Sequence, residues 1–202
     1  MNIHIIIMAK NPFGSDVKTR LAKTMGKEVA QGVYARLLYS TLTKLLTPVR
    51  TDITFVLSLS STQGTKVFKE AYPEIVVTNQ CQGDIGTRMN DAFDRAFQKG
   101  AERALLIGTD LPGINWSILD QALDQINNQT IVLGPTFDGG YYLIGMASPG
   151  IDIFQDILWS SSKVLGQTIK KITEQGYQSV LLSKLQDIDT EKDLLNWQSS
   201  LH

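Results

Sequence analysis

Three aspartates in this 202-residue chain follow or flank apolar residues in a way that suits a metal site. Asp110 comes two residues after the apolar segment 104–108, so it lies where open α/β sheets bind ligands, outside the carboxyl end of a strand. Asp187 and Asp189 are two residues apart, and an extended segment would project both to one side, with Ile188 turned toward the core. Mg²⁺ needs only one or two protein carboxylates, because waters and substrate phosphates complete its octahedron. We therefore predict that these aspartates hold Mg²⁺ or Mn²⁺.

Simpler interpretations of these acids stay open. Asp110 would cap the turn before Pro112, since aspartate often bonds to nearby backbone groups in turns. Asp189 would be a turn residue ahead of a helix. Asp193 is interpreted as structural, because Thr190 and Asp193 have the spacing of a helix-capping box.

A basic loop after the first apolar segment offers the charge that a polyphosphate needs. Lys10, Gly14, Lys18 and Arg20 lie within residues 10–20, and ammonium and guanidinium groups are strong phosphate binders. The loop lacks the second glycine and the Gly-Lys-Ser/Thr ending of a P-loop. We predict that Lys10 and Gly14 contact the nucleotide and that Lys18 and Arg20 are catalytic, neutralising charge on the leaving phosphate. The alternative is a solvated surface loop.

A second glycine-containing segment leads into a helix that we expect over residues 89–99. Gly83 and Gly86 would let the backbone approach a base or ribose closely, and Arg88 adds a positive charge. Helix N-termini also favour anions. These three residues are predicted to bind the nucleotide, although glycine before a helix is also ordinary loop chemistry.

The segment 138–142 has the same two interpretations. Asp138 is a catalytic candidate, Gly139 and Gly140 are nucleotide-binding candidates, and Tyr141 and Tyr142 would line an acceptor pocket. Alternatively, the two glycines form an ordinary hairpin turn.

The elements that must position these residues are short apolar segments alternating with helical patterns. This alternation indicates a largely parallel sheet covered on both faces. One pair of segments, 131–134 and 141–146, is too close for a crossover helix, so we expect one antiparallel element in a mixed sheet. Residues 153–175 are expected to be mostly helical. The apolar segments are 3–8, 53–59, 75–78, 104–108, 131–134, 141–146 and 178–182.

Composition indicates a single globular domain over residues 1–202. With 43% hydrophobic residues and a net charge of -1, the chain is too balanced for a general nucleic-acid or membrane-surface binder. The apolar run 3–8 is far shorter than a bilayer span. The single cysteine, Cys81, cannot form an internal disulfide, which agrees with the cytoplasmic location that we expect. The apolar face over residues 29–46 would pack internally or in a homodimer.

Together, five segments resemble, in order, the signature blocks of a bacterial transferase family that is usually labelled glycosyltransferase, sometimes in the context of arsenosugar biosynthesis. The family is similar to the GT-A-type nucleotide-diphospho-sugar transferases. The Lys-Thr-Arg-Leu loop and the late Asp-Ile-Asp-Thr also resemble 2-phospho-lactate guanylyltransferase. The blocks span most of the chain, at residues 8–22, 83–89, 108–112, 133–145 and 187–190.

The resemblance implies a Rossmann-like three-layer α/β/α sandwich of the GT-A type, with a mixed, mostly parallel sheet. It implies that Asp110 is the metal-binding carboxylate and that Asp187 and Asp189 are further metal ligands. The partners would be a nucleotide donor, either a nucleoside triphosphate or a nucleotide sugar, and a small-molecule acceptor. The family label favours glycosyl transfer, whereas the basic loop favours nucleotidyl transfer from a triphosphate. A non-catalytic nucleotide-binding protein is the alternative from another class.

Overall fold

In the computed structural model, seven strands among the described residues form one mixed sheet, each at a segment that the apolar pattern predicts. The structure describes residues 2–12, 14, 17–47 and 49–199. The strand order is β3-β2-β1-β4-β6-β5-β7. The strands are β1 (Ile3–Ala9), β2 (Ile53–Leu59), β3 (Val76–Asn79), β4 (Arg103–Ile107), β5 (Thr130–Pro135), β6 (Tyr141–Met146) and β7 (Gln178–Leu181).

Strand β6 is the antiparallel element that the short connection predicts. It lies between β4 and β5 and runs antiparallel to both, while the other paired strands are parallel. As a result, the carboxyl ends of β1, β2, β3, β4, β5 and β7 lie at one edge of the sheet, where β6 begins. The segments that carry the predicted site residues after β1, β4 and β5 therefore meet at this edge.

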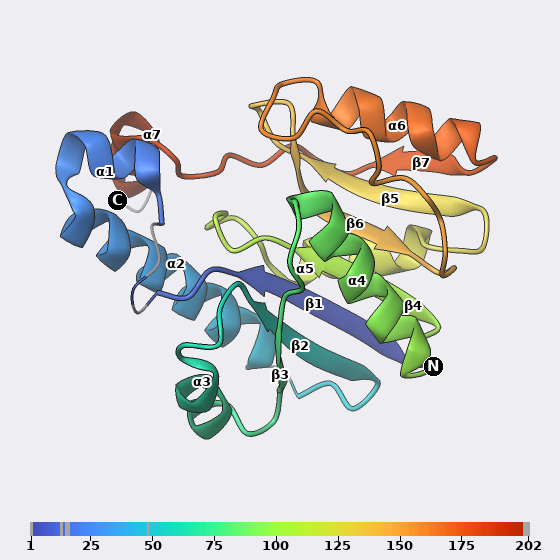
Figure 1. Cartoon of the computed structure of the whole chain (residues 1–202), viewed down its shortest axis with the longest axis horizontal. Helices are drawn as coiled ribbons and strands as arrows, with labels where there is room; N and C mark the ends of the chain where they lie inside the picture. Colours follow the sequence, from blue (N-terminus) through green and yellow to red (C-terminus); the bar gives the residue numbers. More distant parts are fainter. Residues whose placement is uncertain (1, 13, 15–16, 48, 200–202) are drawn as a thin grey trace.

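Helices cover both faces of the sheet, giving the predicted three layers (Figure 1). Figure 1 shows α4 and α6 in front of the sheet and α2 and α5 behind it. The helices are α1 (Thr19–Met25), α2 (Lys27–Leu46), α3 (Thr65–Ala71), α4 (Ile85–Gln98), α5 (Trp116–Gln125), α6 (Val164–Glu174) and α7 (Glu191–Ser199). None of the described helices combines the length and apolar character needed to cross a lipid bilayer.

Strand β1 is apolar along almost its whole length because both of its faces are buried. Ile5 and Ile7 belong to the core beneath α2 and α5, whereas Ile6 and Met8 belong to the core beneath α4 and α6. This double burial is the property expected of a central parallel strand.

A third, smaller core lies at the end of the molecule where α1 and α7 meet α2 (Figure 1). Leu21 from α1, Leu37 from α2 and Leu194 from α7 pack there with Ile188. This packing anchors both the basic loop and the late acidic segment at the same end of α2.

The expected helix over residues 153–175 is wrong in its first half, because α6 begins only at Val164. Residues Ile153 and Phe154 are buried, but they pack against the sheet as an irregular segment. Asp156 and Ser160 have φ angles of 57° and 62°, which are incompatible with a right-handed helix. The buried apolar residues within residues 153–163 owe their spacing to this burial, and this part of the chain is not helical.

Two helix starts are set by side-chain caps. Helix α4 begins at Ile85, earlier than the expected residue 89, because Asp84 Oδ1 accepts a hydrogen bond from the Thr87 amide at 2.8 Å. At α7 the predicted capping box is confirmed. Asp193 Oδ2 accepts from the Thr190 amide at 2.8 Å, and Thr190 Oγ1 accepts from the Asp193 amide at 3.3 Å.

We predict that Asp193→Ala lowers the free energy of unfolding by about 1–2 kcal/mol, because it removes the acceptor for the Asp189 and Thr190 amides that precede α7. Urea denaturation measures this change. Glu191→Ala is the matched control, since it removes an acid from the same helical turn without touching the box, and it should change the free energy by less than about 0.5 kcal/mol. Equal losses in both variants would contradict the capping role of Asp193.

Candidate functional site

A cavity of about 500 Å³ lies at the sheet edge where the parallel strands end. Its volume falls in the range of small-molecule sites, about 300–1,000 Å³. The chain segments after β1, β2, β3 and β4 all contribute to its lining. Eight residues predicted from the sequence line it, namely Lys10, Lys18, Arg20, Arg88, Asp110, Tyr141, Tyr142 and Asp189.

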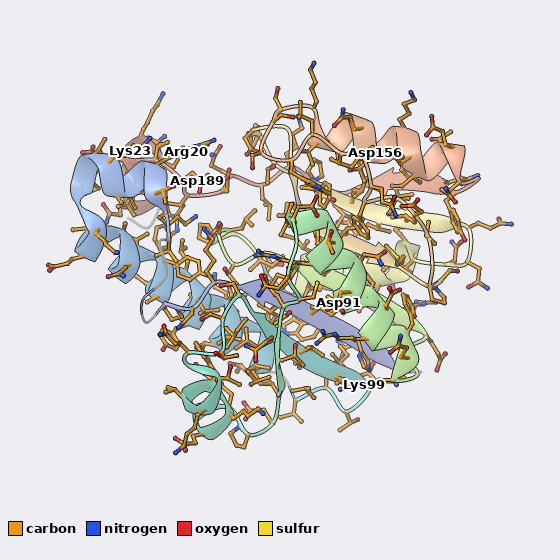
Figure 2. The ribbon with its side chains drawn as sticks, in the orientation of Figure 1. Arg20, Lys23, Asp91, Lys99, Asp156 and Asp189 are labelled. Carbon is orange, nitrogen blue, oxygen red and sulfur yellow. The ribbon has the colours of Figure 1, made fainter. Side chains whose placement is uncertain are left out.

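The buried ammonium of Lys18 joins two of the predicted carboxylates. Lys18 Nζ lies 2.8 Å from Asp110 Oδ1 and 3.0 Å from Asp189 Oδ1, and only 2% of the Lys18 side chain is exposed. Arg20 Nη1 lies 3.6 Å from Asp189 Oδ2. Figure 2 shows Arg20 and Asp189 close together, from α1 and from the segment before α7. Residues from three distant parts of the chain therefore form one ionic cluster.

A backbone hydrogen bond holds the two acidic segments together. The Ile188 amide donates to the Asp110 carbonyl at 3.0 Å. Ile188 is almost fully buried, whereas Asp187 and Asp189 on either side of it are partly exposed. The predicted alternation of this segment is confirmed, and it turns Asp189 toward Lys18.

Tyr34 of α2 connects the basic loop to the segment after β4. Its hydroxyl accepts from the Lys10 amide at 2.7 Å, lies 3.2 Å from the Lys10 carbonyl oxygen, and lies 3.2 Å from Thr109 Oγ1. Burial of the ring raises the pKa of Tyr34 far above its ordinary value, so the hydroxyl remains protonated. Tyr34 thus fixes the backbone at the floor of the cavity.

A second cavity, of about 480 Å³, adjoins the first and shares Arg20, Tyr141 and Asp189 with it. Asp138 and Gly140 line it, opposite the segment 159–162. Asp138 Oδ1 accepts from Thr136 Oγ1 at 2.6 Å and from the Gly140 amide at 3.1 Å. The two interpretations of the segment 138–142, a hairpin turn and part of the site, are therefore compatible, because the turn holds the Asp138 carboxylate at the cavity.

Asp187 lies in an acidic environment but lines neither cavity. Burial, followed by the negative charges of Asp189 and Asp138, raises the pKa of Asp187 to about 6. Such repulsion is relieved by a cation. The raised pKa agrees with a carboxylate near a metal site, while its role as a ligand stays a prediction.

The carboxylates at Lys18 fit a hard divalent cation. Asp110 Oδ1 is buried and accepts no hydrogen bond within the described part of the chain, although the Lys18 ammonium is its ionic partner. No three acidic, histidine or cysteine side chains among the described residues are grouped closely enough to hold one metal ion. Mg²⁺ needs no more than one or two protein carboxylates when phosphates are present. Asp110 and Asp189 supply that number of carboxylates, and the Lys18 ammonium lies between them.

Four of the predicted nucleotide-binding glycines lie outside the lining of both cavities. Gly14 has a φ of 148° and is exposed, and the Gly83 carbonyl accepts from Arg88 Nε at 2.9 Å. A Cβ on Gly86 would lie 2.7 Å from the Phe154 carbonyl oxygen. At Gly139, which has a φ of 92°, a Cβ would overlap the Ser162 backbone. Close packing explains the last two glycines, and nucleotide contact by all four stays a prediction.

Sequence reasoning missed several residues that line the first cavity. Ser60 and Gln80 come immediately after β2 and β3, so a polar residue following an apolar segment was a usable signal. Gln80 Nε2 donates to the Ala9 carbonyl at 3.3 Å and to the Ser58 carbonyl at 2.8 Å, which ties neighbouring strand ends together. Tyr34 had no such signal, because its spacing belongs to the apolar face of α2.

The chain has the fold of the nucleotide-diphospho-sugar transferases. A candidate enzyme of this class from Desulfovibrio desulfuricans G20 matches with a TM-score of 0.86 and 30% identity, over 96% of this chain and 85% of that one. The 4-diphosphocytidyl-2C-methyl-D-erythritol synthase of Anaerococcus prevotii DSM 20548 matches at 0.66 and 12% identity, over 99% and 96%. A nucleotidyl transferase from Methanothermobacter thermautotroptrophicus matches at 0.61 and 13%, over 98% and 97%. At such low identities the last two show the common fold alone.

The chain belongs to the family described as uncharacterized protein conserved in bacteria (DUF2064), whose model matches residues 42–161. A search of curated proteins gave no match. The matched range includes Asp110 and Asp138, while Lys18 and Asp189 lie outside it. The predicted resemblance to nucleotide-diphospho-sugar transferases is confirmed.

We predict that Tyr34→Phe lowers the free energy of unfolding by about 1–3 kcal/mol, because the buried hydroxyl of Thr109 and the part-buried backbone amide of Lys10 lose the Tyr34 hydroxyl as a partner. Tyr39→Phe on the same helix is the matched control, since the Tyr39 ring stacks on Phe68 and the hydroxyl makes no hydrogen bond among the described residues. Chemical denaturation of both variants measures the difference. A loss no larger in Tyr34→Phe than in Tyr39→Phe would argue against the anchoring role.

We predict that Asp187→Asn stabilises the protein at about pH 8 by about 1–2 kcal/mol, less than the full pKa shift implies because solvent screens this partly exposed carboxyl, and has little effect below about pH 4. The pKa of this carboxyl rises from 3.8 to about 6 on folding, so the wild type loses stability as the pH rises through that interval. The amide of the variant does not ionise, so the stability of the variant lacks this dependence on pH. Thermal unfolding across this pH range measures the effect, and Asp124→Asn on α5 is the exposed control. A difference that does not change with pH would contradict the prediction.

Proposed function

We propose that this chain is a divalent-metal-dependent transferase that uses a nucleotide sugar as donor and a small molecule as acceptor. One observation carries the proposal. Two adjoining cavities share Arg20, Tyr141 and Asp189, and the Lys18 cluster lines the first of them. Two cavities meeting at a charged boundary suit two substrates that exchange a group there. The structural neighbour of 30% identity, a candidate nucleotide-diphospho-sugar transferase, supports the same class.

The first cavity is proposed to hold the donor phosphates. Its lining holds four cations and two carboxylates, which leaves an excess of two positive charges. The cations are Lys10, Lys18, Arg20 and Arg88, and the carboxylates are Asp110 and Asp189. A bound Mg²⁺ or Mn²⁺ would act as a Lewis acid on the phosphate oxygens. Asp110 and Asp189 would hold it. The guanidinium of Arg20 lies at the boundary between the cavities, where negative charge builds up on the departing phosphate.

The second cavity is proposed to hold the acceptor beside Asp138. Because Asp138 Oδ1 is already bonded to Thr136 and Gly140, its second oxygen would face the acceptor hydroxyl. As the acceptor oxygen bonds to the sugar, the bond from the sugar to the phosphate breaks. The hydroxyl proton passes to Asp138, and a nucleoside diphosphate leaves.

The charge excess in the first cavity favours a second candidate, in which a nucleoside triphosphate donates a nucleotidyl group. A triphosphate carries more negative charge than the diphosphate of a nucleotide sugar, so four lining cations suit it well. The two candidates differ in their product. Glycosyl transfer releases a nucleoside diphosphate, whereas nucleotidyl transfer releases pyrophosphate.

We predict that Arg20→Gln lowers the transfer rate at least tenfold, which corresponds to about 1.4 kcal/mol of lost transition-state stabilisation. Lys23→Gln is the matched control, because Lys23 lies on the same helix (Figure 2) and is absent from the lining of both cavities. Nucleotide sugars and triphosphates, each with Mg²⁺ or Mn²⁺ and a panel of small hydroxylated or phosphorylated acceptors, are assayed for released diphosphate and pyrophosphate.

Each outcome of this assay decides between the candidates. Pyrophosphate release would replace the glycosyl assignment by the nucleotidyl one. Donor binding measured by calorimetry without release of either product would identify a nucleotide-binding protein without turnover. Absence of binding with every donor would overturn the assignment of the first cavity.

A further inference from the structure

A third cavity, of about 220 Å³, lies on the α4 side of the sheet and shares no lining residue with the two site cavities. It lies between α4 and the strands β1, β2 and β3. Its apolar lining comes from Ile6, Val56, Ala92 and Ala96. The volume is below the range of about 300–1,000 Å³ typical of nucleotide-sized ligands, so its occupant would be small.

A buried histidine in the wall of this cavity has an unsatisfied nitrogen. His4 is 3% exposed, and its Nδ1 has no hydrogen-bond partner within the described residues. Buried polar atoms are almost always bonded, so an orphan beside a cavity points to a partner that enters the cavity. Burial, and then the charge of Lys99, lower the pKa of His4. The imidazole is therefore neutral near pH 7 and has one donor and one acceptor to offer.

The charged residues around the cavity leave one positive charge unbalanced. Arg95 Nε lies 2.9 Å from Asp91 Oδ2, and Arg95 Nη1 donates to the Asn79 carbonyl at 3.2 Å. Lys99 is exposed and makes no ion pair among the described residues. Figure 2 shows Asp91 and Lys99 along α4, next to β1 and β2. With one arginine, one lysine and one aspartate, the cavity lining has a net charge of +1.

We propose that this cavity binds a small monocarboxylate with a compact apolar body. The carboxylate would pair with Lys99 and accept the N–H of His4, while the body contacts the apolar wall formed by Ile6, Val56 and Ala96. A doubly charged phosphate fits less well, because only one cation is unbalanced and Asp91 lines the same space. This binding is independent of the transferase activity proposed above.

Titration of the whole protein with benzoate, followed by the imidazole ¹⁵N resonances of His4, tests the proposal. His4→Gln assigns those resonances, because the chain has only two histidines. Benzamide, which has the same shape without charge, and inorganic phosphate are the comparison probes. Benzoate is expected to shift the His4 resonances saturably and to bind more tightly than benzamide or phosphate.

The exposed Lys99 allows a charge variant that leaves the core unchanged. Lys99→Gln is expected to weaken benzoate binding about two- to fivefold, the range for a solvent-exposed ion pair. Lys66→Gln on α3 is the matched control and should leave the affinity unchanged. The proposal is overturned if benzoate gives no saturable shift, if benzamide binds as tightly, or if both lysine variants bind equally well.

Discussion

The buried ammonium of Lys18 is the interaction on which the candidate site depends. A charge with 2% of its side chain exposed is tolerated only when it is paired, and here the partners are Asp110 and Asp189. The three residues come from the loop after β1, the segment after β4 and the segment before α7. Each of these segments must therefore reach the same point at the sheet edge, and the loss of both carboxylates would leave the buried ammonium uncompensated.

Packing away from the cavity makes this convergence possible. Leu21, Leu37, Ile188 and Leu194 form a small core that holds α1 and α7 against α2, outside the main sheet. Tyr34 then bonds to the loop after β1 and lies within hydrogen-bond distance of the segment after β4. Positioning is thus distributed between an apolar cluster, which brings the segments together, and a few hydrogen bonds, which fix their orientation.

Local chemistry determined which parts of this arrangement could be predicted. The strands, the reversal at β6 and the capping box at Asp193 follow from short-range patterns, and Asp110 follows from its place after an apolar strand. Tyr34 and the burial of Lys18 depend on partners 24 to 171 positions away, which no local pattern encodes. The irregular segment before α6 was misassigned because burial alone made its spacing look helical.

The Lys18 cluster also constrains how a metal and a donor would arrive, given the proposed function. Lys18 lies within 3.0 Å of one oxygen of Asp110 and one of Asp189, so it occupies the space between the two carboxylates that a shared metal would need. A metal entering alone would leave this ammonium buried without a partner, which is costly. Donor phosphates would remove that obstacle, because they would offer the ammonium new anionic partners and supply oxygen ligands to the metal. The arrangement therefore favours metal binding that is coupled to donor binding over a permanently bound metal.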